Sequence, residues 1–183
     1  MVTAEMQFLG GMSLRAYLTD NDLKLVRWDE SMGVEFAEPW YQDPEVLYFS
    51  EGPGFQAFDT ERLWKMYRYL HQHGQLYIIE ISRQGVWRPI GDVTLAQDMM
   101  PIVIGDKNFR GQGLGFRVIS LLIRYAQEQL QWSSLVAHKI YAYNVASLRV
   151  FTKAGFRTTL HAMDDDGVEY VRMERPLLAG FKE

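Results

Sequence analysis

The sequence contains no cysteine among its 183 residues. Without cysteine the protein cannot form disulfide bonds, thiolate zinc sites or a cysteine nucleophile. Histidine is scarce as well. The four residues His71, His73, His138 and His161 include no pair with the His-x-x-x-His spacing of a metal site on a helix. We therefore expect no bound metal.

A basic surplus and a long apolar run are also missing. The 19 Lys and Arg residues face 23 Asp and Glu residues, for a net charge of −4, which argues against a general nucleic-acid binder. No apolar run approaches the roughly 20 residues that a membrane span needs. Residues 1–10 lack the basic and apolar segments of a signal peptide. We expect a cytoplasmic protein with no nucleic-acid partner and no membrane partner.

The length and the hydrophobic content of 48% suit one domain with one sizeable core, which we expect over residues 1–183. Apolar periodicity and turn residues predict a mixed α/β organisation. Strands are expected at residues 14–18, 75–82, 86–95, 99–105, 135–142, 156–162 and 169–174. Helices are expected at residues 23–28 after an Asp20 or Asn21 cap, between Asp59 and Gly74, from residues 110–115 onward, and at residues 145–154.

The most informative segment is the RGQGLG sequence of residues 110–115, which follows the apolar run 102–104 and precedes an amphipathic stretch. A strand that turns through glycines into a helix leaves backbone N–H groups unpaired, and the helix dipole adds positive charge there. Such a site suits a phosphate or pyrophosphate, with Arg110 as a further cation. A dinucleotide fingerprint fails because residue 116 is Phe, and the Gly-Lys-Ser/Thr of a Walker loop is absent. An Arg-x-x-Gly-x-Gly motif remains.

A second block lies further along the chain, with NVAS at residues 144–147 and VFTKAGF at residues 150–156. Together the two blocks resemble the GNAT superfamily of N-acetyltransferases. The first is similar to its acetyl-CoA pyrophosphate loop, and the second to its Asn-x-x-Ser/Ala helix that ends in Lys-x-Gly-Phe. The IGD sequence of residues 90–92 and the IGDK sequence of residues 104–107 add to the match. The likeness is greatest to the branch with ribosomal-protein alanine and spermidine N-acetyltransferases.

The resemblance implies an α/β (α+β) fold, with a mixed twisted sheet of six to seven strands that is splayed at the cofactor site near Gly105, and with helices on both faces. It implies acetyl-CoA-dependent transfer to a primary amine, either a protein N-terminus or a small polyamine-like acceptor, by direct transfer in a ternary complex. An aminoglycoside 6′-N-acetyltransferase is the main alternative, and a non-catalytic acyl-CoA-binding module is a second. A homodimer is compatible with each of these functions.

The resemblance also implies where the cofactor binds. Backbone groups of the strand before the glycine loop would pair with the pantetheine arm, and main-chain N–H groups of the loop would bind pyrophosphate. Asn144 would reach the cofactor arm and Lys153 would lie near its phosphates, although a lysine at a helix end also suits the dipole alone. The implied cofactor-binding residues are Val103, Ile104, Gly105, Arg110, Gly111, Gln112, Gly113, Leu114, Gly115, Asn144 and Lys153.

Catalysis requires a neutral amine, donors for the tetrahedral oxyanion and a proton for the departing thiolate. Many relatives use a tyrosine as the acid at the position of Phe151. We therefore choose Ser147 for the acid, because it lies one helical turn after Asn144. Tyr141 and Tyr143 are alternatives, although aromatic residues in a strand are usually core.

The candidates for the general base are three carboxylates, Asp92, Glu80 and Glu35. Each of them could equally be an ordinary surface charge. A base that acts through water would serve as well. The aromatic residues near positions 40–49 are candidates for the wall of the acceptor pocket or for plain core. They are Trp40, Tyr41, Tyr48 and Phe49, with Glu45 beside them.

Overall fold

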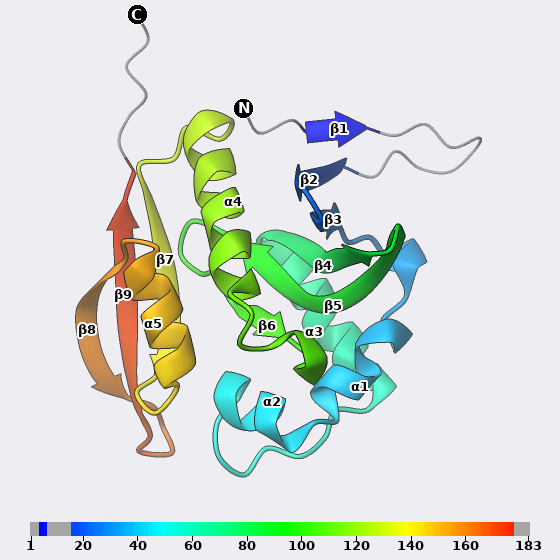
Figure 1. The fold of residues 1–183 in the computed structure, drawn as a ribbon. Coiled ribbons are helices and arrows are strands. Elements are labelled where there is room, and N and C mark those ends of the chain that lie inside the picture. Colours follow the sequence, from blue (N-terminus) through cyan, green and yellow to red (C-terminus); the bar gives the residue numbers. More distant parts are fainter. Residues whose placement is uncertain (1–3, 7–15, 178–183) are drawn as a thin grey trace, which may run out of the picture.

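A computed structural model describes residues 4–6 and 16–177, in which the strands form two antiparallel sheets (Figure 1). The first sheet has its strands in sequence order: β1 (Ala4–Met6), β2 (Ala16–Asp20), β3 (Leu23–Arg27), β4 (Gln75–Arg83), β5 (Val86–Leu95) and β6 (Ile102–Ile104). The second has the order β7-β9-β8: β7 (Ser134–Tyr141), β9 (Glu169–Pro176) and β8 (Arg157–Met163).

Helices lie between these strands along the chain. The α-helices are α1 (Glu38–Tyr41), α2 (Pro44–Ser50), α3 (Thr60–His73), α4 (Leu114–Glu128) and α5 (Val145–Lys153). The described residues also form the short 3-10 helices η1 (Glu30–Met32), η2 (Glu35–Ala37) and η3 (Lys107–Phe109). Figure 1 shows α4 between the two sheets and α3 behind β4 and β5.

Strand β4 shows that helices cover both faces of the first sheet. Tyr77, Ile79 and Ile81 belong to one apolar cluster with residues of α4, while Leu76 and Ile78 belong to a second cluster with α1 and α3. Successive side chains of a strand point to opposite faces, so β4 is buried on both. The expected fold class with helices on both faces is confirmed.

The strands are distributed differently from the expected single sheet of six to seven. Among the residues described, nine strands form two sheets, and β6 is paired with β5 but not with β7. β6 is three residues long and ends at Gly105, after which the chain turns into η3. The sheets therefore separate at the point where the splay was expected.

The prediction of a helix at residues 23–28 is wrong, because Leu23–Arg27 form the strand β3 and Trp28 follows it. Asp20 and Leu23 face each other across a hairpin turn in which Asn21 has φ 56°, so no helix is capped there. Leu23 and Leu25 alternate into the core, and Leu25 pairs with Ile79 of β4. Pairing with β4 buries these side chains, whereas a helix of six residues is too short to be stable by itself. The expected strand at residues 14–18 begins outside the described residues.

The other expected helix boundaries are confirmed. Asp59 caps α3 by accepting a hydrogen bond from Arg62 N–H at 2.8 Å. Gly74 ends that helix. Gly155 follows α5 with φ 86°, a left-handed conformation that favours glycine.

Candidate functional site

The glycine loop leads into α4 with its backbone exposed. Gly111 and Gly113 have φ 72° and 76°, and a Cβ atom at either position would meet no atom within 4 Å. No side chain caps α4, whose first turn begins at Leu114. The N–H groups of this turn lack intrahelical partners by geometry. The loop therefore offers donors and a helix dipole at an open surface, which suits an anion.

Gly115 has a different environment. It lies inside α4, and a Cβ atom here would approach Val150 of α5 at 3.8 Å. This distance is ordinary van der Waals contact, so the third glycine of the motif lies at the packing of α4 against α5.

Strand β6 has one free edge within the described part of the chain. The Pro101 carbonyl accepts from Thr94 N–H of β5, and Val103 lies opposite Asp92. Because bonded and non-bonded positions alternate in an antiparallel pair, the main-chain groups of Val103 face β5 and those of Ile102 and Ile104 face away. Of the three residues expected to bind pantetheine, Ile104 therefore presents its N–H group to the open edge.

The Arg110 side chain lies elsewhere than expected, because it bonds α2 and β6 rather than facing the glycine loop. Its Nε donates to the Ile104 carbonyl at 3.0 Å and its Nη2 to the Gly105 carbonyl at 2.7 Å. Nη2 also donates to Asp43 at 2.9 Å, and Nη1 to Glu45 at 2.7 Å. The guanidinium is engaged by two carboxylates, and its role as a phosphate cation stays a prediction.

Asn144 and Ser147 lie at the start of α5. The Asn144 amide oxygen accepts from Ser147 N–H at 3.0 Å and caps the helix, while its amide nitrogen donates to the Phe49 carbonyl at 3.3 Å. The Ser147 hydroxyl makes no hydrogen bond with any residue that the structure describes. Asn144 is therefore held in place at the start of α5, and the serine hydroxyl is available to a ligand.

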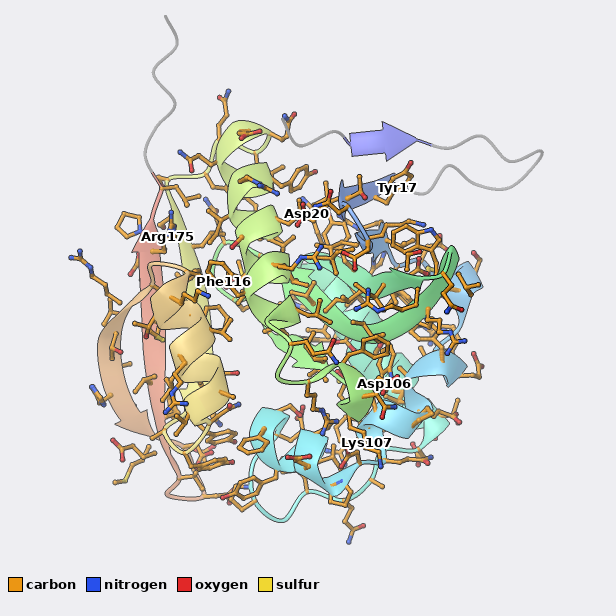
Figure 2. The ribbon with its side chains drawn as sticks, in the orientation of Figure 1. Tyr17, Asp20, Asp106, Lys107, Phe116 and Arg175 are labelled. Atoms are coloured by element: carbon orange, nitrogen blue, oxygen red, sulfur yellow. The ribbon has the colours of Figure 1, made fainter. Side chains whose placement is uncertain are left out.

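A hollow of about 240 Å³ lies between α4 and α5. The Lys153 ammonium lies 4.4 Å from the ring centroid of Phe116, and Figure 2 shows Phe116 between the two helices. Arg124 and Arg175 bring two more cations to the lining. Sequence reasoning missed both arginines, because Arg175 comes from β9 and no local pattern links it to the loop. The full lining is Phe116, Ser120, Ile123, Arg124, Lys153, Ala154 and Arg175.

Asp92 is a buried carboxylate with two tyrosine partners. It is 3% exposed, and it accepts hydrogen bonds from the Tyr41 hydroxyl at 3.0 Å and the Tyr67 hydroxyl at 2.8 Å. Burial raises the pKa of Asp92 to about 6, although the two hydroxyl donors lower it in part. Its alternative reading as a surface charge is wrong. The sequence predicts a helix between Asp59 and Gly74 but no role for the hydroxyl of Tyr67, which was missed.

Tyr141 lies at the end of β7 beside α2. Its hydroxyl is 2.6 Å from the Glu51 carbonyl and 3.1 Å from Asp164, which is paired with Lys139 at 2.9 Å. Burial raises the pKa of Tyr141. Burial, followed by the neighbouring Tyr141, raises the pKa of Tyr143 to about 12. Both hydroxyls therefore keep their protons near neutral pH.

Two other expected candidates have structural partners. Glu80 pairs with Lys24 at 3.6 Å across β3 and β4, and Glu35 accepts from Val34 N–H at 3.0 Å. Phe151 is a core residue, whose ring packs edge-on against Phe156 at 5.0 Å. The position at which many relatives have a tyrosine acid is thus an apolar core position in this chain.

The expected aromatic wall divides into buried and exposed members. Trp40 and Tyr41 are core residues, and Trp40 packs so closely on Gly105 that a Cβ atom there would clash with its ring. Tyr48 and Phe49 of α2 are 43% and 37% exposed. Tyr48 also stacks on Tyr143 at 4.4 Å.

The expected catalytic residues Asp92, Tyr141 and Ser147 are not bonded to each other, and Ser147 lies on α5. Asp92 contacts Tyr41 at the end of α1, and Tyr141 contacts Glu51 just after α2. Within residues 4–6 and 16–177 no hydrogen bond joins Asp92, Tyr141 and Ser147. In the same ranges no cluster of His, Asp or Glu could hold a metal ion, and no helix combines the length and apolarity of a membrane span.

The family model for the acetyltransferase (GNAT) domain matches residues 22–157, which is most of the chain. This chain belongs to the GNAT acetyltransferase family. Membership confirms the expected superfamily and the expected enzyme class, and acetyl-CoA fits this acetyltransferase as its co-substrate. The match does not distinguish the branch with ribosomal-protein alanine and spermidine N-acetyltransferases. No curated protein matches the chain.

Solved structures share the fold of this GNAT acetyltransferase at low sequence identity. A domain from Methanocaldococcus jannaschii is 18% identical with a TM-score of 0.72, over 85% of this chain and 98% of that one. An aminoglycoside acetyltransferase, AAC(6')-Ib, in complex with coenzyme A is 16% identical with a TM-score of 0.69, over 84% and 94%. A GNAT-family acetyltransferase from Bacillus anthracis is 12% identical with a TM-score of 0.68, over 87% and 98%.

Proposed function

We propose that this GNAT acetyltransferase binds acetyl-CoA against the glycine loop and the first turn of α4, and that it acetylates a primary amine. The observation that carries this proposal is the exposed, uncapped start of α4, where Gly111 and Gly113 have left-handed backbone conformations. A pyrophosphate there would accept hydrogen bonds from main-chain N–H groups that have no other partner.

The neighbouring elements suit the rest of the cofactor. The free edge of β6 offers the Ile104 N–H group to an extended amide-containing arm, in the way that a strand adds to a sheet. The cations of the hollow between α4 and α5, among them Arg124 and Lys153, suit the remaining phosphate charge of a coenzyme A. The Ser147 hydroxyl, at the start of α5, is available as a donor.

In the reaction, the amine nitrogen forms a bond to the acetyl carbon and the carbon–sulfur bond breaks. We assign Asp92 as the group that takes the amine proton, which reaches it through the hydroxyl of Tyr41 or Tyr67. Its pKa of about 6 leaves it ionised and able to accept a proton at neutral pH. Ser147 is assigned to protonate the departing thiolate, with Tyr141 as the alternative.

The acceptor is proposed to be a protein N-terminal amine or a small polyamine-like amine. The charge of one segment of the chain favours the polyamine-like amine. Residues 29–61, which include α1 and α2, contain three Asp and six Glu residues but no Lys, Arg or His. Three cations from outside the segment, Lys65, Arg68 and Arg110, pair with four of these carboxylates, so a negative surplus remains. This surplus beside the site would attract a molecule with several protonated amines.

An aminoglycoside 6′-N-acetyltransferase is the second candidate function, because such an acceptor is also a polycation and the fold is shared with AAC(6')-Ib. A panel of N-terminal peptides, spermidine and kanamycin, each supplied with acetyl-CoA, tests these acceptors. Turnover of spermidine with none of kanamycin supports the polyamine-like acceptor. Coenzyme A binding without turnover of any amine would support a non-catalytic module. The cytoplasmic location and a homodimer stay predictions.

A further inference from the structure

Helix α2 is attached to the first sheet at its N-terminal end through Arg110. One oxygen of Asp43 caps α2 by accepting from Glu45 N–H at 2.9 Å, and the other accepts from Arg110. Burial alone would raise the pKa of Asp43, but the bonds from Arg110 and from Glu45 N–H outweigh it and lower the pKa. Arg110 also holds the carbonyls of Ile104 and Gly105, so its guanidinium joins α2 to the end of β6.

The C-terminal end of α2 is attached to the other side of the splay. The Tyr48 carbonyl accepts from the Tyr143 hydroxyl at 2.6 Å, and the Phe49 carbonyl accepts from Asn144. The Tyr141 hydroxyl reaches the carbonyl that follows the helix. These donors come from the end of β7 and the start of α5. Helix α2 thus bridges the two sheets at the point where they separate, as Figure 1 shows.

Such a short helix depends on these attachments. α2 has seven residues, fewer than an isolated helix needs to be stable in water. Any change that fixes Arg110 therefore acts on the order of α2 as well.

We infer that Arg110 is a positioning residue that couples the glycine loop to α2. Its backbone begins the loop, and its side chain holds the helix that carries the exposed aromatics Tyr48 and Phe49. An anion bound to the loop N–H groups restricts the backbone of Arg110, and the guanidinium passes this restriction to α2. Cofactor binding thereby orders α2, which lies where the two sheets separate and where the acceptor is proposed to bind. The inference rests on the cofactor site proposed above.

The geometry requires arginine rather than a cation in general. A planar guanidinium donates to two carboxylates and two carbonyls at once, whereas a lysine ammonium has three donors on a flexible stem and cannot reproduce the fork. Arg110→Lys keeps the charge and the loop backbone, but it removes the link. Asp43→Asn removes the charge pair from the other side and keeps a good helix cap.

The matched control is Arg117→Lys. Arg117 lies on the first turn of α4 and, like Arg110, pairs with two carboxylates, Asp20 at 3.5 Å and Asp22 at 2.7 Å. Its partners belong to the hairpin between β2 and β3, away from α2. Loss of this second fork should affect stability in a similar way without affecting the coupling.

Hydrogen exchange with coenzyme A as the probe tests the inference without turnover. At 100 times its dissociation constant, coenzyme A should slow exchange at residues 111–116 by up to about 100-fold in all four proteins. It should also slow exchange at residues 45–51 by about 5- to 30-fold in the wild type and Arg117→Lys. In Arg110→Lys and Asp43→Asn the second effect should fall below twofold.

Each outcome has a separate meaning. No slowing at residues 111–116 in the wild type would defeat the proposed cofactor site. Slowing there with none at residues 45–51, or equal slowing of α2 in Arg110→Lys, would overturn the coupling alone. With an acceptor in hand, Arg110→Lys should raise the acceptor KM about tenfold and change the acetyl-CoA KM less than twofold. The reverse pattern would mean that Arg110 serves the cofactor directly.

Discussion

The two faces of the first sheet bury different kinds of side chain. Against α4 the buried side chains are apolar apart from the Tyr77 hydroxyl, with Val118, Leu121 and Leu122 fully covered. Against α1 and α3 the core encloses an ionisable group, Asp92, with two tyrosines. Burying a carboxylate costs free energy, and the two hydroxyl donors offset this cost only in part, because the pKa of Asp92 stays raised. A raised pKa is what the proposed role of Asp92 as the base requires. The face with α4 supports a helix whose exposed end suits an anion.

The largest expected effect is the loss of activity when Asp92, on the face with α1 and α3, is replaced. Asp92→Asn should lower kcat/KM by about 10²-fold or more, as removal of a general base does. The acidic limb of the pH profile, which rises as pH passes about 6, should vanish in the variant. Steady-state kinetics between pH 5 and pH 8 measure both. The matched control is Glu80→Gln, and an equal loss in that variant would contradict the assignment.

The second expected effect concerns the stability of the same face. The folded pKa of Asp92 is about 6, above the ordinary value of 3.8, so the folded state binds a proton that the unfolded state has already lost. Between these values the stability of the wild type should fall with rising pH relative to Asp92→Asn, by about 3 kcal/mol in total. Denaturant unfolding of both proteins from pH 3.5 to pH 7 measures the change. A constant difference would show that the carboxylate titrates normally.

The third prediction concerns the exposed end of α4. Gly113→Ala should weaken coenzyme A binding about tenfold, because an alanine disfavours the left-handed backbone that aims the N–H groups. Gly167→Ala is the control, since Gly167 has the same φ of 76° and equal space but lies in the turn between β8 and β9. Calorimetric titration compares them. Equal affinity in the two variants would argue against the glycine loop as the binding site.

The smallest expected effect concerns the hollow beside α4. Lys153→Met removes one of three cations and should weaken coenzyme A binding about threefold at low salt, with less effect at high salt. Lys65→Met is the control, because Lys65 is an exposed lysine paired with Glu61 on α3. If both variants bind coenzyme A like the wild type, the hollow is not part of the cofactor site.

Local patterns predicted the elements around the glycine loop and α5. The cap of α3 at Asp59 and the extent of α5 depend on neighbouring residues, so a sequence contains them directly. Asn144 was expected only at the cofactor arm, and its role as the cap of α5 was missed. The same reasoning was wrong for residues 23–28. There the apolar residues Leu23 and Leu25 pair with β4, a partner more than fifty residues away that local periodicity does not include.

Side-chain partners were predicted less well than elements. Arg110 was expected to face an anion because it begins the loop, yet its guanidinium reaches Asp43 and Glu45 on a distant helix. Asp92 was the first of three candidates for the base, and Glu80 and Glu35 differ from it in their surroundings rather than in chemistry. Burial separates the three, and burial depends on how α1 and α3 pack.

By itself the sequence determined the strand, glycine loop and helix that identify the family, because backbone conformation and capping arise from residues next to each other in the chain. The tertiary structure alone decided the environment of Asp92, since Tyr41 and Tyr67 lie 51 and 25 residues away from it along the chain. It also decided that α2 joins the two sheets. Both arrangements exist only after folding brings distant segments into contact, and desolvation then gives the carboxylate its raised pKa.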